Sequence, residues 1–310
     1  MKILITGGAG FIGSRIAAHY LRGGWDVVVV DNLVTGRRDN VPADARFYEL
    51  DIRAPDFGGV VGGERPDLIS HHAAQMDVRL STEDPAYDAD VNVVGSLKVI
   101  QAALAADVKK IIFASTGGAI YGEPEFIPVD EDCPTRPLSP YGCSKLAVEH
   151  YLYLYYAQRG LPYVALRYPN VYGPGQNPKG EAGVTAIFAL KMLAGEPCVI
   201  YGDGTETRDY VYIDDVVDAH ARAAAAPFTG VLCVGSGQEV TVPQIHDKLA
   251  ALTGTKIKPE RQPLRPGEIH RICISGKRAK KVLGWEPRVG FDEGLARLVA
   301  YLREHGDEYR

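Results

Sequence analysis

Long hydrophobic runs are missing from this sequence, although 46% of its 310 residues are hydrophobic. A helix that crosses a membrane needs about 20 consecutive apolar residues, and no segment approaches that length. The first residues, KILITGGAGFIG, also lack the succession of basic, apolar and small residues that is typical of a secretory signal peptide. We therefore expect a cytoplasmic protein that has no membrane partner.

Cysteine is also scarce, which argues against a chain held together by disulfides or zinc. The five cysteines are an odd number and include no Cys-x-x-Cys pair; they are Cys133, Cys143, Cys198, Cys233 and Cys273. A disulfide framework or a zinc site would need closer and more regular spacing. The cysteines are therefore expected to be reduced, and no metal site is predicted.

An excess of positive charge is likewise absent, because 39 acidic residues outnumber 34 basic ones and give a net charge of -5. General nucleic-acid binders are normally basic, so this composition disfavours a nucleic-acid partner. It does not exclude an anionic substrate, since a few arginines can bind phosphate against a mildly acidic background.

The first half of the sequence alternates regularly between strand-length and helix-length segments. The expected strands cover residues 2–6, 26–30, 46–50, 67–71, 110–115 and 163–167, and the expected helices cover residues 11–22, 91–106 and 144–159. The strand at 26–30, DVVVV, is apolar along almost its whole length, as in a parallel strand that is covered on both faces. This pattern predicts an α/β protein with a Rossmann-type, doubly wound parallel sheet.

The second half has a different texture, and residues 170–183 are rich in Gly, Pro and Asn. Its expected elements are short strands at 198–201 and 231–234 and a helix at 242–253. We expect residues 1–167 to form a domain that binds a dinucleotide, joined by part of residues 209–237. Residues 168–310 should form mainly a smaller, mixed α/β substrate domain, so that the substrate binds between the two.

A glycine-rich turn joins the first expected strand to the first expected helix, with glycines at Gly7, Gly10 and Gly13. Small residues let backbone N–H groups and the helix N-terminus approach a pyrophosphate. Asp31 ends the next strand, about 20 residues further on, where an acid binds the adenosine ribose hydroxyls. An acid there repels a 2′-phosphate and favours NAD over NADP. The basic pair at residues 37–38 could attract such a phosphate, or could simply lie in a solvated loop.

Two further strand ends carry residues that suit a bound dinucleotide. Asp51 and Ile52 follow the third strand and could hold the adenine, or could simply end the strand. Ala73 and Ala74 follow the fourth strand, where small side chains allow a backbone to pass near the cofactor or to pack tightly. Both pairs are assigned to the cofactor site with these alternatives open.

Tyr141 and Lys145 are the strongest candidates for chemistry. Ser139-Pro140 is a typical start of a helix, so the two side chains lie one turn apart on one face. A free tyrosine has a pKa of about 10, and an adjacent ammonium or an oxidised nicotinamide lowers it toward neutrality. Such a pair could equally be an exposed surface pair. Ser115 and Thr116, however, place hydroxyls at a strand end where they can point into the same cleft.

These motifs occur in a particular order, namely TGGAGFIG at 6–13, Asp31, Ser115-Thr116, Tyr141-x-x-x-Lys145 and RYPNVYGP at 167–174. Together they resemble the extended short-chain dehydrogenase/reductase superfamily over essentially the whole chain. Within it, the chain is most similar to the UDP-glucose 4-epimerases, also called UDP-galactose 4-epimerases. The similarity continues through GEAGVTAIF at 180–188, YGDGT at 201–205, RDYVYIDD at 208–215 and RPGE at 265–268.

The resemblance implies a role for each matching residue. Tyr141 would remove the proton of the sugar 4-hydroxyl, while Lys145 would bind the nicotinamide ribose and tune Tyr141. Thr116, with Ser115 beside it, would hydrogen-bond the reacting hydroxyl. The implied contacts to UDP are Asn170, Arg208 and Arg265 for the diphosphate and Glu268 for the uridine ribose. We also assign Phe11, Ile12, Asn32, Gln75, Asn92 and Tyr168 to the cofactor site, and Val184 and Tyr201 to the substrate site.

The implied reaction is NAD-dependent 4-epimerisation of UDP-glucose or UDP-galactose through a transient 4-keto sugar, a step of galactose metabolism. Gly117 and Gly118 supply no acid after Thr116, whereas the sugar-nucleotide 4,6-dehydratases and the UDP-glucuronate decarboxylases carry acids there. Both of those reactions are therefore disfavoured. The segment STGGAIYG is one residue longer than the family's frequent Ser-Ser-x-x-Val-Tyr-Gly form, which leaves the choice between Ser115 and Thr116 open.

Other substrates and one other class of protein stay open. Ile272 lies where some family members carry a bulky aromatic, so a UDP-N-acetylhexosamine is an alternative substrate; UDP-glucuronate would need a cationic partner that we do not identify. A non-catalytic NAD-sensing scaffold is the alternative outside enzymes, and Tyr141 and Lys145 argue against it. The family also implies a homodimer built from the helices at 91–106 and 144–159, although these helices could instead cover the sheet.

Overall fold

The computed structural model describes residues 1–177, 183–263 and 269–309, and its centre is a seven-stranded parallel sheet in the order β11-β6-β5-β4-β1-β2-β3. The strands are β1 (Lys2–Thr6), β2 (Asp26–Asp31), β3 (Arg46–Glu49), β4 (Leu68–His71), β5 (Lys110–Thr116), β6 (Tyr163–Tyr168) and β11 (Gly230–Cys233). The chain runs outward from β1 to β3 and then crosses to β4, so the strand order reverses between β1 and β4. Ligands of such sheets bind at the carboxyl ends of the strands near this reversal. The predicted doubly wound α/β fold is confirmed.

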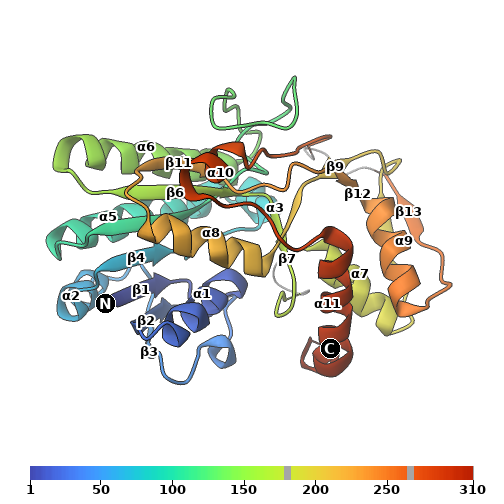
Figure 1. Cartoon of the computed structure of the whole chain (residues 1–310), viewed down its shortest axis with the longest axis horizontal. Helices are drawn as coiled ribbons and strands as arrows, with labels where there is room; N and C mark the ends of the chain where they lie inside the picture. Colours follow the sequence, from blue (N-terminus) through green and yellow to red (C-terminus); the bar gives the residue numbers. More distant parts are fainter. Residues whose placement is uncertain (178–182, 264–268, 310) are drawn as a thin grey trace.

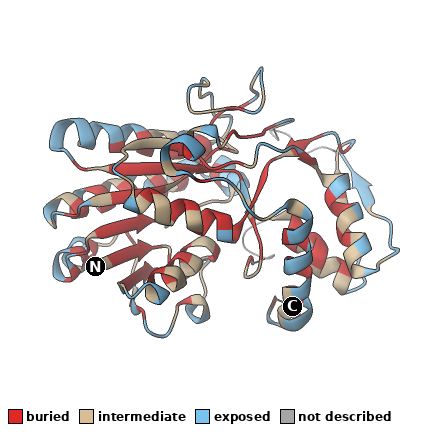
Figure 2. Ribbon diagram, viewed as in Figure 1, coloured by how far each residue is buried: buried red, intermediate tan, exposed pale blue. Residues whose placement is uncertain are grey.

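Helices cover both faces of this sheet (Figure 1). One face carries α1 (Phe11–Arg22), α8 (Ile213–Ala225) and α10 (Lys277–Leu283), and the other carries α2 (Phe57–Glu64), α5 (Gly95–Ala105) and α6 (Pro140–Arg159). Alternate residues of β1 serve the two faces, because Ile3 and Ile5 join the first core and Leu4 joins the second. Figure 2 accordingly shows the strands buried between the helix layers. Strands covered in this way read as apolar runs in the sequence.

Two helices begin elsewhere than the sequence predicts. α6 starts at Pro140 and not at residue 144, since the Ser139 side chain accepts a hydrogen bond from the Gly142 amide and Pro140 occupies the first turn. The helix expected at residues 91–106 starts as a π turn, η2 (Asp90–Val94), before α5 begins. Single π turns are common beside functional sites. Tyr141 therefore lies in the first turn of its helix.

The second half forms a separate group of elements with a core of its own, which includes Tyr172, Phe188 and Leu298. Its elements are β7 (Asn170–Tyr172), α7 (Val184–Leu193), β8 (Val199–Tyr201), β9 (Thr207–Arg208), β10 (Tyr210–Tyr212), β12 (Val240–Thr241), α9 (Val242–Thr253), β13 (Glu260–Gln262), α11 (Phe291–His305) and η3 (Gly306–Tyr309). α8 and β11 leave this group, and β11 pairs with β6 at the edge of the central sheet. The remaining elements are η1 (Arg38–Asn40), α3 (Val78–Glu83) and α4 (Pro85–Ala89).

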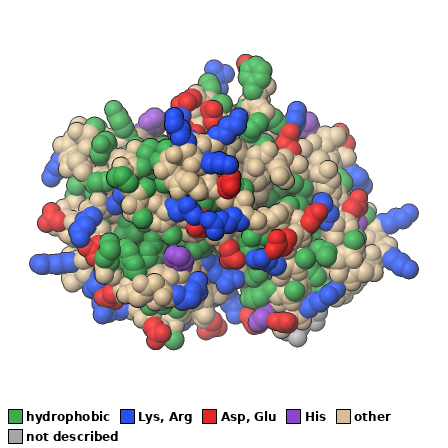
Figure 3. Space-filling view, in the orientation of Figure 1, with side chains coloured by type: hydrophobic (Ala, Val, Ile, Leu, Met, Phe, Trp, Pro, Cys, Tyr) green, Lys and Arg blue, Asp and Glu red, His purple; other side chains and the backbone are tan. Residues whose placement is uncertain are grey.

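Basic side chains gather across the middle of the face in Figure 3, over α8 and α10. Two basic side chains of α10 pair with neighbouring acids, Arg278 with Asp132 at 2.5 Å and Lys280 with Glu286 at 2.5 Å. None of the helices in the described ranges is long and apolar enough to cross a membrane.

Candidate active site

The turn after β1 has the shape that its glycines suggested. Gly7 has a φ of +70°, and a Cβ added to it would lie 2.5 Å from the Ala73 amide nitrogen. A Cβ on Gly13 would lie 2.3 Å from the Gly7 carbonyl oxygen. The N-cap of α1, Gly10, has no side chain to cap the first amides of the helix. A bare helix N-terminus beside a glycine turn is a site for a phosphate group, so these residues fit a dinucleotide.

Asp31 lies beside this turn at the end of β2. Its carboxylate accepts hydrogen bonds from the Ala9 amide at 3.0 Å and the Leu33 amide at 2.8 Å, which fixes its direction. The two nearby arginines are engaged elsewhere, because Arg37 stacks on Tyr309 and Arg38 stacks on the Phe47 ring. Phe11 is buried and Ile12 is half-buried, and both pack with the core of the second half.

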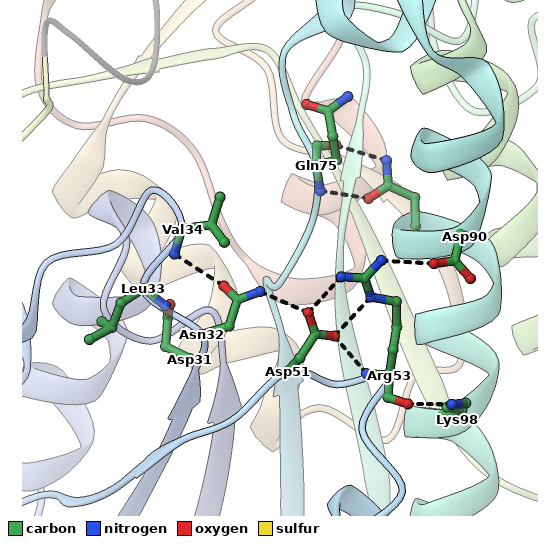
Figure 4. Close-up of polar contacts among 10 residues, drawn as sticks. Asp31, Asn32, Leu33, Val34, Asp51, Arg53, Gln75, Asp90 and Lys98 are labelled. Carbon is green, nitrogen blue, oxygen red and sulfur yellow. Dashed lines mark hydrogen bonds and ion pairs between the residues drawn. The ribbon is translucent and has the colours of Figure 1, made fainter.

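Asp51 belongs to a polar group at the ends of β2 and β3 (Figure 4). Asn32 donates to Asp51 at 2.9 Å, and the Arg53 guanidinium donates to the same carboxylate at 2.7 and 2.9 Å. Arg53 holds the pKa of Asp51 well below its usual range. Ile52 is 4% exposed and packs in the core next to Gly95, as a residue that simply ends a strand would. The structure therefore offers Asp51 and Asn32, but not the Ile52 side chain, to a ligand.

The segment after β4 is held by Asn92, which lies on the π turn η2. The Gln75 amide donates to Asn92 Oδ1 at 2.9 Å, and Asn92 Nδ2 donates back to the Gln75 carbonyl at 2.7 Å. Ala73 and Ala74 are half-buried and lie between this clamp and the glycine turn. Asn92 thus shapes the loop that passes the cofactor site.

Tyr141 and Lys145 share one face of α6, which rests on the ends of the central strands. Lys145 is 3% exposed, donates to the Ala114 carbonyl at 3.0 Å and lies 5.8 Å from the centre of the Tyr141 ring. Burial lowers the pKa of Lys145 to about 8, and the negative charge of Asp88 opposes that change. Tyr141 is half-buried. The arrangement can stabilise a phenolate at the ends of the central strands.

Ser115 and Thr116 have different surroundings, although both end β5. Ser115 donates to Glu149 at 2.5 Å, and Glu149 forms a buried ion pair with Arg167 at 2.6 Å. Ser115 is therefore committed to this network. Thr116 is 9% exposed, and in the described part of the chain its hydroxyl has no hydrogen-bond partner. Thr116 is the hydroxyl that is available to a ligand.

Tyr168, which the sequence assigns to the cofactor site, is the last residue of β6. Its ring packs in the core under α1 and α8, on the face of the sheet opposite Phe113, which lies beside Lys145. Its hydroxyl is buried without a hydrogen-bond partner among the described residues. The carbonyl of Tyr168, which accepts from the Gly117 amide at 2.7 Å, is what this residue contributes at the strand end. Successive side chains of a strand point to opposite faces, so a residue at this strand end can have its ring on the face opposite Lys145.

Two of the expected substrate residues lie close together, because the Asn170 amide donates to the carbonyl of Asp209, the residue after Arg208, at 3.1 Å. Asn170 is exposed on β7, and Arg208 lies on β9 with its guanidinium 2.9 Å from the Thr207 carbonyl. Val184 begins α7, and Tyr201 ends β8. Arg265 and Glu268 lie outside the described residues.

Two buried acids near the site, Asp88 and Glu149, were missed by the motif analysis. Asp88 is 0% exposed and Glu149 is 4% exposed. A signal for the second existed in the sequence, because Arg167 stands inside the apolar strand YVALRY, and a charge at such a position needs a buried partner. No comparable signal marked Asp88.

Comparison with known proteins decides the family. The model of the "NAD dependent epimerase/dehydratase family" matches residues 3–234. The chain belongs to this family. A UDP-glucose 4-epimerase of Mycolicibacterium smegmatis is 42% identical over 309 residues, which cover 98% of this chain and 99% of that protein.

Two solved structures are similar to this family member over nearly their whole length. The UDP-glucose 4-epimerase of Thermotoga maritima, solved with UDP-glucose, has a TM-score of 0.97 and 44% identity, covering 98% of this chain and 99% of that one. The UDP-glucose 4-epimerase of Thermus thermophilus, solved with NAD, has a TM-score of 0.93 and 45% identity, with the same coverage of both chains. The resemblance inferred from the sequence is confirmed.

Proposed function

We propose that this chain is an NAD-dependent 4-epimerase that interconverts UDP-glucose and UDP-galactose, a reaction of galactose metabolism. The observation that carries the proposal is the contact of Lys145 with the Tyr141 ring, 5.8 Å from its centre, at the same strand ends as the glycine turn. The relatives described above, which are 42–45% identical over nearly the whole chain, are UDP-glucose 4-epimerases, and they include one structure solved with UDP-glucose and one solved with NAD.

The residues divide into three groups, which bind the cofactor, transfer the proton and anchor the diphosphate of the substrate. Gly7, Gly10 and Gly13 would receive the pyrophosphate, and Asp31 would accept hydrogen bonds from the adenosine ribose. When bound, NAD supplies a reversible hydride acceptor for the sugar C4, so that the reaction causes no net oxidation. We also propose that residues 1–167, with α8 and β11, form the cofactor side and that residues 168–310 form most of the substrate side.

The proton is handled by Tyr141. In the proposed reaction it takes the proton of the sugar 4-hydroxyl. It returns the proton after the 4-keto sugar has rotated to present its opposite face. The Lys145 ammonium stabilises the phenolate that this step requires. Thr116 orients the reacting hydroxyl, since Ser115 is bound to Glu149. Asn170 and Arg208 would anchor the diphosphate, which leaves the hexose free to rotate.

Elimination of water fits this site less well. A Cβ on Gly117 would lie 2.2 Å from Ile274 Cδ1, so an acidic side chain does not fit there without movement of the core. Gly118 supplies no acid either. Positions 117 and 118 therefore do not provide the general acid that loss of a hydroxyl group from the sugar requires.

The test is turnover of purified protein without added cofactor. We expect UDP-galactose to be converted to UDP-glucose, and acid to release NAD that mass analysis identifies. A folded, NAD-containing protein that leaves UDP-galactose unchanged would contradict the proposal. UDP-N-acetylgalactosamine and UDP-glucuronate belong in the same panel.

Ile272 is 2% exposed in a core with Ile120 and Val129, which gives no support for a widened sugar pocket.

We also propose that a second copy of the chain covers α6. This helix exposes apolar side chains toward solvent, with Tyr153 at 63%, Leu154 at 40% and Tyr156 at 43%, and Val94 of η2 at 43%. Monomeric proteins rarely expose contiguous apolar patches of this kind. The support is this surface together with the dimer that the family resemblance implies.

Light scattering tests the dimer. We expect the parent to have twice the mass of one chain, and the variant with Tyr153→Glu and Leu154→Glu to have the mass of one chain. The charged side chains would have to be buried unpaired in the interface. The control is Val282→Glu, which is 37% exposed and belongs to α10, a helix on the opposite face of the sheet from α6. A parent of monomeric mass, or a double variant that stays dimeric, would contradict the proposal.

A further inference from the structure

Asp88 is a buried carboxylate that connects three elements around the reaction site. It lies on the short helix α4 and is 0% exposed. Its Oδ1 accepts from Gln75 Nε2 at 2.9 Å and from Asn92 Nδ2 at 2.9 Å, and its Oδ2 accepts from Ser144 Oγ at 2.7 Å. Gln75 follows β4, Asn92 lies on the π turn and Ser144 directly precedes Lys145 on α6.

The same junction continues to the glycine turn through hydrogen bonds of defined direction. The Ala73 amide donates to Thr6 Oγ1 at 3.3 Å, so the Thr6 hydroxyl is free to donate to His71 Nδ1 at 2.7 Å. His71 Nε2 then donates to Ser96 Oγ at 2.8 Å, because Ser96 donates its own hydrogen to the Asn92 carbonyl at 2.5 Å. A continuous network of hydrogen bonds thus joins the end of β1, beside the glycine turn, to α6.

A buried carboxylate needs more than neutral donors, because its removal from water is unfavourable. The nearby positive group is Lys145, which follows Ser144 and whose own hydrogen bond goes to the neutral Ala114 carbonyl. The charge of Asp88 raises the pKa of Lys145, while burial lowers it to about 8. The charge of Asp88 therefore opposes the effect of burial on Lys145, and the hydrogen bond from Ser144 holds Asp88 against the helix that carries Lys145.

The other titratable groups around Lys145 do not take this role. His71 and His72 at the end of β4 are uncharged at neutral pH, since burial lowers the pKa of each to about 3. Glu149, one turn further along α6, is paired with Arg167 of β6. Tyr141 is the reacting group itself. Among the described residues, Asp88 is the acid whose negative charge raises the pKa of Lys145.

We propose that Asp88 is a positioning residue of the reaction proposed above: its carboxylate ties α6 to the end of β4 through Ser144 and keeps Lys145 in its ammonium form beside Tyr141. The inference rests on the proposed function for its catalytic consequence. The protonation of Lys145, however, can be measured without any turnover.

Asp88→Asn separates the charge from the hydrogen bonds. The amide oxygen of asparagine can accept from Gln75 and Asn92, and its NH2 group can donate to the Ser144 hydroxyl, which is then the acceptor. The matched control is Asp84→Asn on the same helix. Asp84 is an exposed N-cap that accepts from the Tyr87 amide at 2.9 Å, and asparagine caps a helix as well as aspartate does.

The direct measurement is NMR of NAD-containing protein labelled with carbon-13 at lysine. The Lys145 signal is assigned by its loss in Lys145→Arg, and its midpoint is followed against pH. We expect a midpoint of about 8 in the parent and in Asp84→Asn. In Asp88→Asn the midpoint should fall by about one unit, because the loss of an adjacent negative charge favours the neutral amine.

Turnover should follow the protonation of Lys145, since the ammonium is lost as the pH rises through its pKa. With a shift of about one unit, kcat of Asp88→Asn should be about fivefold lower than that of the parent at pH 8 and nearly equal at pH 6, with little change in KM. A merely structural defect would lower kcat by the same factor at both pH values.

Ser144→Ala tests the tie to α6 separately and keeps the carboxylate. We expect kcat to fall by about tenfold through misplacement of Tyr141, while the lysine midpoint stays near that of the parent. An active parent whose lysine midpoint and pH profile are unchanged in Asp88→Asn would overturn the role of its charge, and unchanged kcat in Ser144→Ala would overturn the tie. A parent that does not convert UDP-galactose would instead contradict the proposed function.

Discussion

Replacing Tyr141 by phenylalanine should lower the turnover of UDP-galactose by about a thousandfold or more, the contribution expected of a positioned general acid and base. The ring stays in place, so the contact of Lys145 with the aromatic face, 5.8 Å from its centre, is retained. What is lost is the one hydroxyl that can take and return the proton of the sugar. Binding of the UDP portion should change little, because its contacts lie on other elements.

The measurement is kcat and KM for UDP-galactose, with the NAD content of each preparation determined by acid release. Tyr155→Phe is the matched control, because it removes a phenolic hydroxyl from a half-buried position on the same helix. It should keep the turnover of the parent. If Tyr141→Phe retained more than about a tenth of the parent kcat with full NAD content, Tyr141 would not be the proton carrier.

Replacing Glu149 by glutamine should lower the free energy of unfolding by about 3–5 kcal/mol, the usual effect of removing one partner of a buried ion pair. The side chains of Arg167 and Glu149 are only 6% and 4% exposed, and Arg167 donates to both carboxylate oxygens. Glutamine keeps the shape of the side chain but leaves the guanidinium without a counter-charge. Ser115 loses a charged acceptor in the same step.

Urea unfolding measures this effect. The urea concentration at the midpoint of unfolding should fall, while the slope of the free energy of unfolding against urea concentration stays unchanged. The control is Glu293→Gln, which removes the partner of Arg297 on the exposed face of α11, where the two side chains are 55% and 46% exposed. Exposed pairs contribute about 0–1 kcal/mol. Equal losses in the two variants would show that burial does not make the Glu149 pair important.

The comparison of sequence and structure separates two kinds of information. The glycine turn, Asp31 at the end of β2 and the pair on α6 could be read from the sequence, because each depends on residues within one or two neighbouring elements. The alternation of apolar strands and helices indicated the doubly wound sheet for the same reason. Even the late start of the helix expected at residue 144 was a local error, since Ser139 and Pro140 were visible as a helix start.

The choice between Ser115 and Thr116 needed the tertiary structure. Both hydroxyls end the same strand, and only the position of Glu149 on α6 shows that Ser115 is engaged. The ring of Tyr168 is a second example. The motif placed the residue at the right strand end, but the face of the sheet toward which its side chain points depends on the register of β6 against its neighbours.

The sequence by itself therefore determined the fold class, the cofactor turn and the tyrosine–lysine pair, because local spacing and periodicity encode helices, strands and turns. The family followed from the resemblance of its ordered motifs. Only the tertiary structure decided which strand-end hydroxyl is available and that Asp88, 53 residues before Tyr141 in the chain, faces α6 through Ser144. Such contacts join segments that are distant in the chain. They depend on the order in which strands assemble and on the close packing of helices against them, and no local pattern of residues records either.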